Sequence, residues 1–427
     1  MININLIRKY PDLVKENIKK KFQEHRLFLI DRFKVLDEEW RHLKIENDSL
    51  RSKRNKISQE INEAKKTNDH KLKELIKEAK SIPERIKEID EKLKNLEEEI
   101  EQIMHKIPNL ISKETPLGRD ESQNKEIKKH GKIPKFKFSI KNHVELLEHL
   151  NLVDFEASAK VSGNGFYYLK GKLALLNQAL IRFVIDFMNK KKYEYIETPL
   201  MLNEKSISSS MDKETIENSV YSIKDEDLNL IGTAEQSLLA MHSQKTIKES
   251  ELPKKYFSYS MCFRKEVGAH GINEKGLWRT HQFNKIEQFI FCKPEDSEKL
   301  YKELLKNSEE ILNALELPYR VLEICSGDLS DWKHRSADLE VYRATTKSYG
   351  EVMSLSNCTD YQARKLDIKC IDNKGNKRTL HTLNNTALAT SRILVALTEN
   401  NQQKDGSIKI PKALWKYTGF KKISSLK

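Results

Sequence analysis

Two long stretches near the start of the chain carry apolar residues at alternating steps of three and four. The first includes Leu29, Phe33, Leu36, Trp40, Leu43, Asn47, Leu50, Arg54, Ile57, Ile61 and Ala64. The second follows a polar turn at residues 65–71 and includes Leu72, Leu75, Ala79, Ile82, Ile86, Ile89, Leu93, Leu96, Ile100, Ile103 and Ile107. This spacing is the heptad pattern of coiled coils. Because only a short turn joins the stretches, they are expected to fold back as an antiparallel hairpin with arms about 55 Å long.

Three residues interrupt this apolar seam. Asn47 and Arg54 take positions that a coiled coil fills with apolar side chains, where a polar residue can set the register. Pro83 lies inside the second arm, where proline is expected to kink or break the helix. The distal residues 51–80 hold ten Lys or Arg against five Asp or Glu. A projecting basic tip suits contact with a nucleic-acid backbone, and a solvated coiled coil used for dimerisation is the alternative.

The rest of the chain changes from long repeats to short alternating segments. Residues 108–135 are rich in proline, glycine and mixed charges, which is typical of a linker. The later pattern predicts helices over 143–152, 173–187 and 297–315, strands over 166–169, 193–199, 227–231, 319–324, 338–341 and 351–354, a turn at 373–376, and an apolar helix after the small residues 382–390. From about residue 142 the chain therefore reads as a globular region of short strands and helices.

The segment 261–287 gathers an unusual density of chemistry. Its two ends alternate as strands around a glycine-bearing polar loop, which predicts an antiparallel hairpin. Alternation would place Arg264 and Glu266 on one face of the first strand, and Phe283 on the neighbouring strand. An arginine, a carboxylate and an aromatic ring can bind a phosphate, a base amino group and a base ring. A solvated, salt-bridged hairpin explains the same spacing equally well.

Three further places could bind ligands, each with a simpler explanation beside it. Thr233 and Glu235, at a strand-to-helix turn, can hold an ammonium and a hydroxyl, or Thr233 can simply cap the helix. Glu351 and Ser354 can offer oxygen ligands to a magnesium ion that also holds phosphates. Arg392 falls within an apolar helix, where a buried guanidinium needs an anion such as a triphosphate or an internal carboxylate.

Composition narrows the class of protein. In 427 residues, 77 Lys and Arg exceed 64 Asp and Glu, for a net charge of +13. This excess favours a protein that binds a polyanion such as nucleic acid over a soluble protein that is merely rich in lysine. The five scattered cysteines have no metal-ligand spacing and are expected to be reduced thiols of a cytoplasmic protein. No signal peptide and no membrane-spanning segment is expected.

Several ordered motifs together resemble those of seryl-tRNA synthetases, which are class II aminoacyl-tRNA synthetases. They are the coiled-coil arm, SGNGFYYL at 162–169, TAEQ at 233–236, FRKEVGAHG at 263–271, HQFNKIEQF at 281–289, EVMSLSNCTDYQAR at 351–364 and TLNNTALATSR at 382–392. Helix 172–190 with Pro199 resembles the first class II motif, 263–289 the second and 382–411 the third. The resemblance extends over almost the whole chain.

The resemblance implies an α+β fold, in which a coiled-coil hairpin precedes a mixed, mainly antiparallel sheet flanked by helices. The implied domains are a tRNA-binding arm at 1–110, a linker at 111–140 and a class II catalytic domain at 141–427. The implied activity is that of a serine–tRNA ligase, which makes seryl-adenylate from serine and ATP and transfers the seryl group to the 3′ end of tRNA(Ser), with tRNA(Sec) as a conceivable second acceptor. ATP with Mg²⁺ and L-serine are the implied ligands, zinc is not expected, and a homodimer is expected.

The resemblance also assigns residues to the site. Catalysis is implied for Arg264, at the α-phosphate, for Glu266, at the adenine amino group, and for Arg392, at the γ-phosphate. ATP binding is implied for Arg264, Lys265, Glu266, Thr280, Phe283, Glu351, Val352, Met353, Ser354 and Arg392. Serine binding is implied for Thr233, Ala234, Glu235, Arg264, Glu287 and Thr386, and magnesium binding for Glu351 and Ser354.

The chain departs from the usual family pattern in two segments. Residues 206–212 stand where a glycine-rich loop is common, and the acidic stretch 212–217 suggests an archaeal-like branch. In the loop 269–280, Asn273, Glu274, Trp278 and Thr280 replace more common residues, and this loop contacts the tRNA acceptor end in class II enzymes. Two alternative functions remain at this point: a paralogue that charges a carrier protein, and a coiled-coil RNA-binding protein with a relic catalytic domain.

Overall fold

The structure is a computed structural model that describes residues 1–67, 71–211, 213–266 and 276–424. The chain divides into two compact units, Ile2–Pro108 and Asn109–Lys427, with Met1 grouped with the second. We refer to them as the arm unit and the sheet unit. Among the described residues, no helix is long and apolar enough to cross a membrane.

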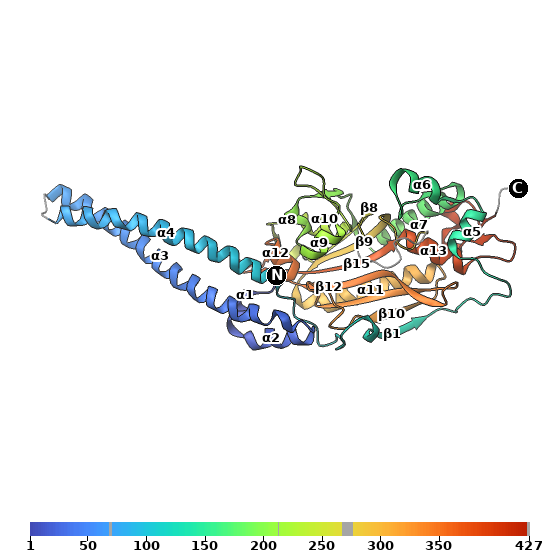
Figure 1. The fold of residues 1–427 in the computed structure, drawn as a ribbon, viewed down its shortest axis with the longest axis horizontal. Coiled ribbons are helices and arrows are strands. Elements are labelled where there is room, and N and C mark those ends of the chain that lie inside the picture. Colours follow the sequence, from blue (N-terminus) through green and yellow to red (C-terminus); the bar gives the residue numbers. More distant parts are fainter. Residues whose placement is uncertain (68–70, 212, 267–275, 425–427) are drawn as a thin grey trace. The chain divides into compact units, whose positions relative to one another are not determined.

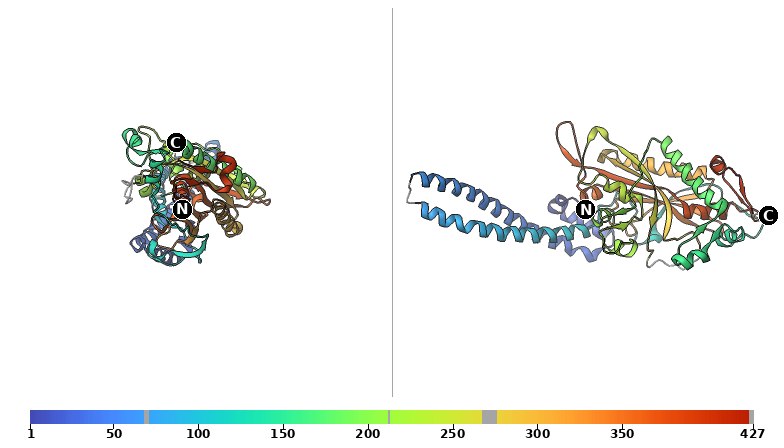
Figure 2. Two further views of the ribbon diagram at one scale, coloured as in Figure 1. Left: turned by 90° about the vertical axis from the view of Figure 1, so that its right-hand side faces the viewer. Right: turned by 90° about the horizontal axis from the view of Figure 1, so that it is seen from above.

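In its described residues, the arm unit has helices as its only regular elements. It consists of α1 (Ile4–Lys9), α2 (Pro11–Lys20), the short 3₁₀ helix η1 (Glu24–Arg26), α3 (Phe28–Thr67) and α4 (Leu72–Lys106). In two views α3 and α4 lie side by side along their length (Figures 1 and 2). Apolar seam residues such as Phe33, Ile57 and Ile89 are buried between them. The predicted antiparallel coiled-coil hairpin is therefore confirmed.

The residues that interrupt the seam behave differently from one another. Asn47 is buried and donates from Nδ2 to Asp90 Oδ1 at 2.6 Å, so a polar pair lies in the seam at that level. Arg54 is exposed, so its predicted core position is wrong. Pro83 does not break α4, because it lies on the exposed face while Ile82 and Ile86 on either side are buried. The backbone carbonyl that loses its hydrogen bond to proline can be hydrated on that face.

The sheet unit is built on one eight-stranded sheet in the order β1-β10-β11-β12-β15-β9-β8-β4 (Figure 1). Its strands are β1 (Lys125–His130), β4 (Glu194–Tyr195), β8 (Lys254–Phe263), β9 (Gln282–Cys292), β10 (Tyr319–Glu323), β11 (Arg335–Arg343), β12 (Ser348–Thr359) and β15 (His381–Ala389). All neighbours are antiparallel except β4 and β8. The predicted mixed, mainly antiparallel sheet is confirmed.

Smaller sheets and helices surround this sheet. The small sheets pair β2 (Val153–Asp154) with β3 (Tyr168–Leu169), β5 (Met201–Leu202) with β6 (Asn229–Leu230), β16 (Ile408–Lys409) with β17 (Lys422–Ile423), and join β7 (Thr246–Lys248), β13 (Lys369–Ile371) and β14 (Lys377–Thr379). The helices are α5 (His143–His149), α6 (Phe155–Ser162), α7 (Gly171–Lys190), α8 (Glu204–Ile207), α9 (Lys213–Ser219), α10 (Ala234–Ala240), α11 (Ser297–Ala314), α12 (Tyr361–Lys365), α13 (Thr390–Asn400) and α14 (Trp415–Thr418). The strand predicted over 193–199 is reduced to β4.

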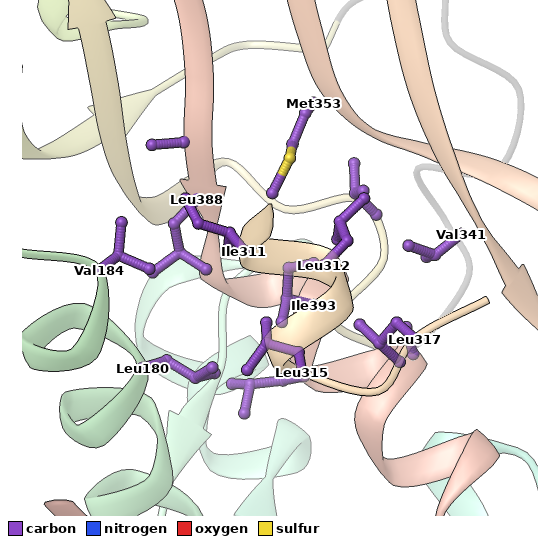
Figure 3. Packing of buried hydrophobic residues seen from close by; sticks show 14 of the residues in the cluster. Leu180, Val184, Ile311, Leu312, Leu315, Leu317, Val341, Met353, Leu388 and Ile393 are labelled. Atoms are coloured by element: carbon purple, nitrogen blue, oxygen red, sulfur yellow. The ribbon is translucent and has the colours of Figure 1, made fainter. Parts of the chain in front are cut away.

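The apolar core of the sheet unit lies between the large sheet and three helices. Figure 3 shows Leu180 and Val184 of α7, Ile311 of α11 and Ile393 of α13 meeting Met353 of β12. The apolar faces of these helices repeat at steps of three and four, which is why each covers the sheet along one stripe. With the core on this side, the polar residues that alternate with core residues along β12, β15 and β9 face the other way.

The segment predicted as a linker contributes to the sheet unit. Strand β1 pairs with β10, and upstream of it Ser112 N donates to His334 O at 2.8 Å and Gly327 N donates to Gly118 O at 2.8 Å. All six side chains of β1 are exposed. A strand without an apolar face has no alternation to reveal it, so the hydrophobic pattern could not distinguish it from a linker.

Candidate active site

A cavity of about 310 Å³ opens on the polar side of the central strands. Side chains from β9, β12 and β15, from the starts of α10 and α13, and from the segments after β8 and before β9 line it. Its size lies at the low end for small-molecule sites. The lining includes these predicted residues: Thr233, Glu235, Arg264, Glu266, Thr280, Phe283, Glu287, Glu351, Val352, Ser354, Thr386 and Arg392.

The hairpin β8–β9 is antiparallel, as predicted, but its first strand ends at Phe263. Arg264 and Glu266 therefore lie beyond the strand and do not share a strand face. Glu266 has a φ of 52°, and this left-handed backbone turns the chain away from the strand direction. The two side chains still reach the same cavity because the chain bends there, a feature that strict alternation could not predict.

Arg264 is held at its inner side. Its Nε and Nη2 atoms donate to Gly232 O, each at 3.2 Å, and its guanidinium carbon lies 5.3 Å from the centre of the Phe283 ring. Thr280, which also lines the cavity, is buried. The arginine is thus oriented by a carbonyl and an aromatic face before any ligand arrives.

Arg392 has an internal carboxylate partner. Its Nη1 donates to Glu351 Oε2 at 3.0 Å and to Glu351 O at 2.7 Å, and its Nε donates to Trp278 O at 3.3 Å. Burial alone would raise the pKa of Glu351, but the Arg392 charge and hydrogen bond bring it below its ordinary value. Of the two partners considered from the sequence, the carboxylate is present, and the described residues accept no hydrogen bond from Nη2.

One end of the cavity holds a compact group of charges. Lys285 Nζ lies 2.7 Å from Glu287 Oε2 and donates to Thr233 Oγ1 at 3.0 Å. Thr233 also caps α10, accepting from Glu235 N at 3.3 Å, so the simpler explanation for this residue holds as well. Glu287 is 1% exposed. The Glu287 carboxylate thus already contacts the Lys285 ammonium group and accepts from the Thr233 hydroxyl at 3.4 Å. These contacts indicate that this end of the pocket can bind an ammonium group and a hydroxyl.

Glu235 is a second carboxylate of the same region and also lines the cavity. Its Oε1 accepts from Gln362 Nε2 at 2.7 Å and from Asn384 Nδ2 at 2.9 Å. Burial and the nearby Glu287 carboxylate raise the pKa of Glu235. Two amide donors hold it in place, so it can orient the pocket's polar groups while Glu287 faces the cavity.

A set of oxygen atoms near Glu351 suits a hard cation. Glu351 and Ser354 line the cavity, and Asp338 pairs with Ser354 across β11 and β12. Asp338 Oδ1 is buried and has no hydrogen-bond partner among the described residues. Carboxylate and hydroxyl oxygens are ligands that Mg²⁺ prefers. Among the described residues, no group of three His, Cys, Asp or Glu residues could hold a metal ion. An ion bound here would therefore be coordinated in part by a ligand or by water.

Three predicted residues lie outside the cavity lining. Lys265 Nζ donates to Glu217 O at 3.3 Å, and Met353 is buried in the core on the other side of β12. Ala234 is buried as the first residue of α10. Adjacent positions in a strand face opposite sides of the sheet, which explains why Val352 and Ser354 reach the cavity and Met353 does not.

Other lining residues were missed. Lys285 alternates with Phe283 and Glu287 along β9, and Asn384 alternates with Thr386 along β15, so period-two spacing could have found both. Trp278 and Ser391 also line the cavity. Neither has a pattern in the sequence that separates it from structural residues.

The two divergent segments can be described in part. Met211 and Ser219 line the cavity, and Gln236 Nε2 contacts Met211 Sδ at 3.8 Å. The α8–α9 segment thus covers the end where Thr233 lies, while Asp212 is outside the described residues. For the loop 269–280, residues 267–275 lie outside the described residues, including Asn273 and Glu274, and Leu277 to Thr280 are described.

Two family models match the chain. Residues 1–111 match the seryl-tRNA synthetase N-terminal domain, and residues 218–401 match the tRNA synthetase class II core domain (G, H, P, S and T). The first covers the helical hairpin, and the second covers the cavity-lining segments from Ser219 to Arg392.

Named relatives match over nearly the full length. The serine–tRNA ligase of Dictyoglomus thermophilum is 44% identical, covering 100% of both chains, and that of Methanocella arvoryzae is 42% identical, covering 98% of both. The structure of the seryl-tRNA synthetase from Pyrococcus horikoshii complexed with ATP superimposes with a TM-score of 0.94 at 38% identity, covering 100% of both chains. Archaeal relatives are therefore among them, in keeping with the predicted archaeal-like branch.

Proposed function

Because the chain belongs to the seryl-tRNA synthetase family, we propose that its cavity binds ATP and L-serine side by side and that its arm unit binds tRNA(Ser). The activity is that of a serine–tRNA ligase. The serine carboxylate attacks the α-phosphorus of ATP, diphosphate leaves, and the resulting seryl-adenylate donates its seryl group to the 3′ end of tRNA. No covalent enzyme intermediate is required, so the protein contributes by positioning and charge.

In this proposal the nucleotide lies between the segment after β8 and the start of α13. Arg264 binds the α-phosphate, where negative charge develops during attack. Glu266 accepts from the adenine amino group, and Phe283 stacks on the base. Arg392 binds the γ-phosphate. The support is that all four line one cavity and that both guanidinium groups are already oriented by carbonyl acceptors.

The proposed magnesium ligands are Glu351 and Ser354. When bound with ATP, the ion neutralises phosphate charge in the transition state. Glu351 is engaged by Arg392, so we propose that this pair loosens when the triphosphate takes up the arginine. Asp338, which pairs with Ser354 across the two strands, has a buried Oδ1 without a hydrogen-bond partner among the described residues, so one further oxygen acceptor there is unused.

The serine pocket is proposed at the opposite end, around Thr233, Glu287 and Thr386. Glu287 binds the substrate ammonium, and Thr386 and Glu287 contact the hydroxyl. Glu235 orients the group through Asn384, which neighbours Thr386 on the same strand face. A pocket whose buried polar groups are left unpaired by alanine rejects alanine strongly.

The arm unit carries the proposed tRNA contact. The distal residues 51–80 have twice as many basic as acidic residues, and the basic side chains described there, such as Lys53, Arg54, Lys73 and Lys77, are exposed. Phosphate contacts by such residues would make the affinity for tRNA fall as the salt concentration rises.

We also propose a homodimer, with β4 at one end of the large sheet and the exposed Leu175 of α7 near the contact between the two copies. The protein would act in the cytoplasm, where its five free, buried cysteines stay reduced.

The carrier-charging alternative lacks support, since the chain retains the tRNA-binding arm that such a paralogue would not need. The observation that carries the proposal is the meeting of Arg264, Phe283, Glu351 and Arg392 with Thr233 and Glu287 in one cavity. The test is serine-dependent ATP–diphosphate exchange followed by charging of tRNA(Ser). Both activities are expected; exchange without charging would support the carrier function, and the absence of both would support the relic.

A further inference from the structure

The Trp278 ring, at the edge of the cavity, contacts two guanidinium groups. The guanidinium carbon of Arg343 is 4.3 Å from the ring centre, and that of Arg392 is 5.5 Å from it. The backbone of the same residue accepts the Arg392 Nε hydrogen bond at 3.3 Å. One residue therefore contacts Arg392 twice, through its ring and through its carbonyl.

These contacts use only part of the Arg392 guanidinium. Nε is bonded to Trp278 O, and Nη1 is bonded to Glu351. The two hydrogens of Nη2 have no acceptor among the described residues, and Arg392 lines the cavity. A guanidinium that is hydrogen-bonded through Nε and Nη1 can still donate from Nη2 to an anion.

The Arg343 guanidinium that contacts the Trp278 ring is itself held in place. Arg343 Nη2 donates to Glu399 Oε1 at 3.2 Å, and Thr345 Oγ1 donates to Glu399 Oε2 at 2.7 Å. Glu399 is fully buried. Arg343 Nε is buried without a hydrogen-bond partner in the described chain. The cation is thus tied to a buried carboxylate on one side and stacked on the indole on the other, which orients the ring.

The backbone before Trp278 is fixed by the same carboxylate. His143 Nδ1 lies 3.0 Å from Glu399 Oε1, and His143 Nε2 accepts from Leu277 N at 3.1 Å. These partners require a neutral imidazole with its proton on Nδ1. A Cβ on Gly350 would lie 2.4 Å from the indole Cζ2, so only glycine leaves room for the ring.

We infer that Trp278 is a positioning residue that sets the Arg392 guanidinium for the nucleotide, with Glu399 as the buried anchor of its supports. This inference rests on the proposed nucleotide role of Arg392. It assigns a function to a position where the chain departs from the common family residues. Trp278 need not touch ATP, because its effect passes through Arg392.

The experiment is a double-mutant cycle on ATP–diphosphate exchange. Trp278→Leu should raise the KM for ATP about tenfold while the KM for serine stays within twofold, because the serine pocket lies at the other end of the cavity. Trp278→Phe should restore the ATP KM to within about threefold, since it keeps an aromatic face. In the Arg392→Ala background, Trp278→Leu should change ATP kinetics less than twofold.

A purely structural role predicts a different result. A Trp415→Leu control removes a half-buried tryptophan at α14 and should leave the ATP KM unchanged. Equal effects of Trp278→Leu with and without Arg392, or equal rises in both KM values, would overturn the inference. Should Trp278→Leu fail to fold, Trp278→Met, whose unbranched side chain adapts more easily to the space left by the ring, enters the same cycle. If Arg392→Ala itself leaves exchange intact, the proposed role of Arg392 fails instead.

Discussion

Ion pairs along the α3–α4 hairpin and ion pairs in the cavity lie in different surroundings. In the arm, Arg51 and Asp90 pair at 2.7 Å with both side chains 45% exposed. In the cavity, Lys285 and Glu287 pair at the same 2.7 Å with side chains 10% and 1% exposed. Exposed pairs contribute about 0–1 kcal/mol each because water and salt screen them. Buried pairs are costly to break, so removing one partner there should have large and local effects.

The difference separates two kinds of recognition. The arm offers many exposed charges of similar, small influence, which suits a long polyanion. The cavity concentrates a few desolvated charges from segments far apart in the chain, which suits a small substrate whose every polar atom must be matched. The predictions below test this division, beginning with the largest expected effect.

Removing a cavity arginine should nearly abolish activation. We expect Arg264→Ala to lower exchange by about 10³-fold, because charge developing on the α-phosphate loses its partner. Exchange assays at saturating serine measure this, with circular dichroism to check the fold. Arg378→Ala, which removes an ion-paired arginine outside the cavity, should leave exchange within twofold. If both variants lost exchange activity to a similar extent, the idea that charges in the cavity matter most for activation would be wrong.

Deleting residues 36–100 and closing the gap with a short turn should separate the two units functionally. Exchange should remain within about threefold, while charging of tRNA(Ser) should fall by about 10²-fold through loss of phosphate contacts. Steady-state charging as a function of tRNA concentration measures the loss. Unchanged charging would show that the arm is not the tRNA reader.

The buried Glu399 should make the sheet unit sensitive to acid. Burial acts to raise the pKa of Glu399, but the His143 hydrogen bond and the Arg343 charge bring it from 4.5 to about 2. Since the folded value is the lower one, its stabilisation is present above about pH 4.5 and is lost as the pH falls towards 2; it amounts to at most about 3 kcal/mol. Urea unfolding should show Glu399→Gln less stable than the parent at pH 6.5, with a smaller difference in the free energy of unfolding at pH 3. Glu145→Gln, on the exposed side of α5, should show no such gap.

Neutralising three exposed basic residues near the arm tip should have the smallest effect. Arg54, Lys73 and Lys77 changed together to alanine should weaken tRNA binding about tenfold and reduce the slope of log affinity against log salt by about 2. The matched variant changes Lys87, Lys92 and Lys94 to alanine; these residues are exposed on α4 at a greater distance from the tip. Equal losses in both triple variants would mean that net charge, and not the tip, determines binding.

Local sequence determined the arm almost completely. Its heptad spacing depends on neighbours three and four residues apart, and a two-helix hairpin satisfies that spacing without any distant contact. Even there, the exposure of Arg54 and the continuity of α4 through Pro83 depended on which face of the helix packs. The same local logic correctly predicted the Thr233 cap and the β8–β9 hairpin.

For the sheet unit, the motifs identified the residues proposed to contact ATP and serine, but not how they are held. Alternation along β9 and β15 contained the signal for Lys285 and Asn384. No local signal could show that β8 ends before Arg264, that β1 joins the sheet with every side chain exposed, or that Arg392 binds Glu351. Only the tertiary structure decided these, because each depends on contacts between segments separated by tens to hundreds of residues, and such pairings leave no trace in the spacing of either segment.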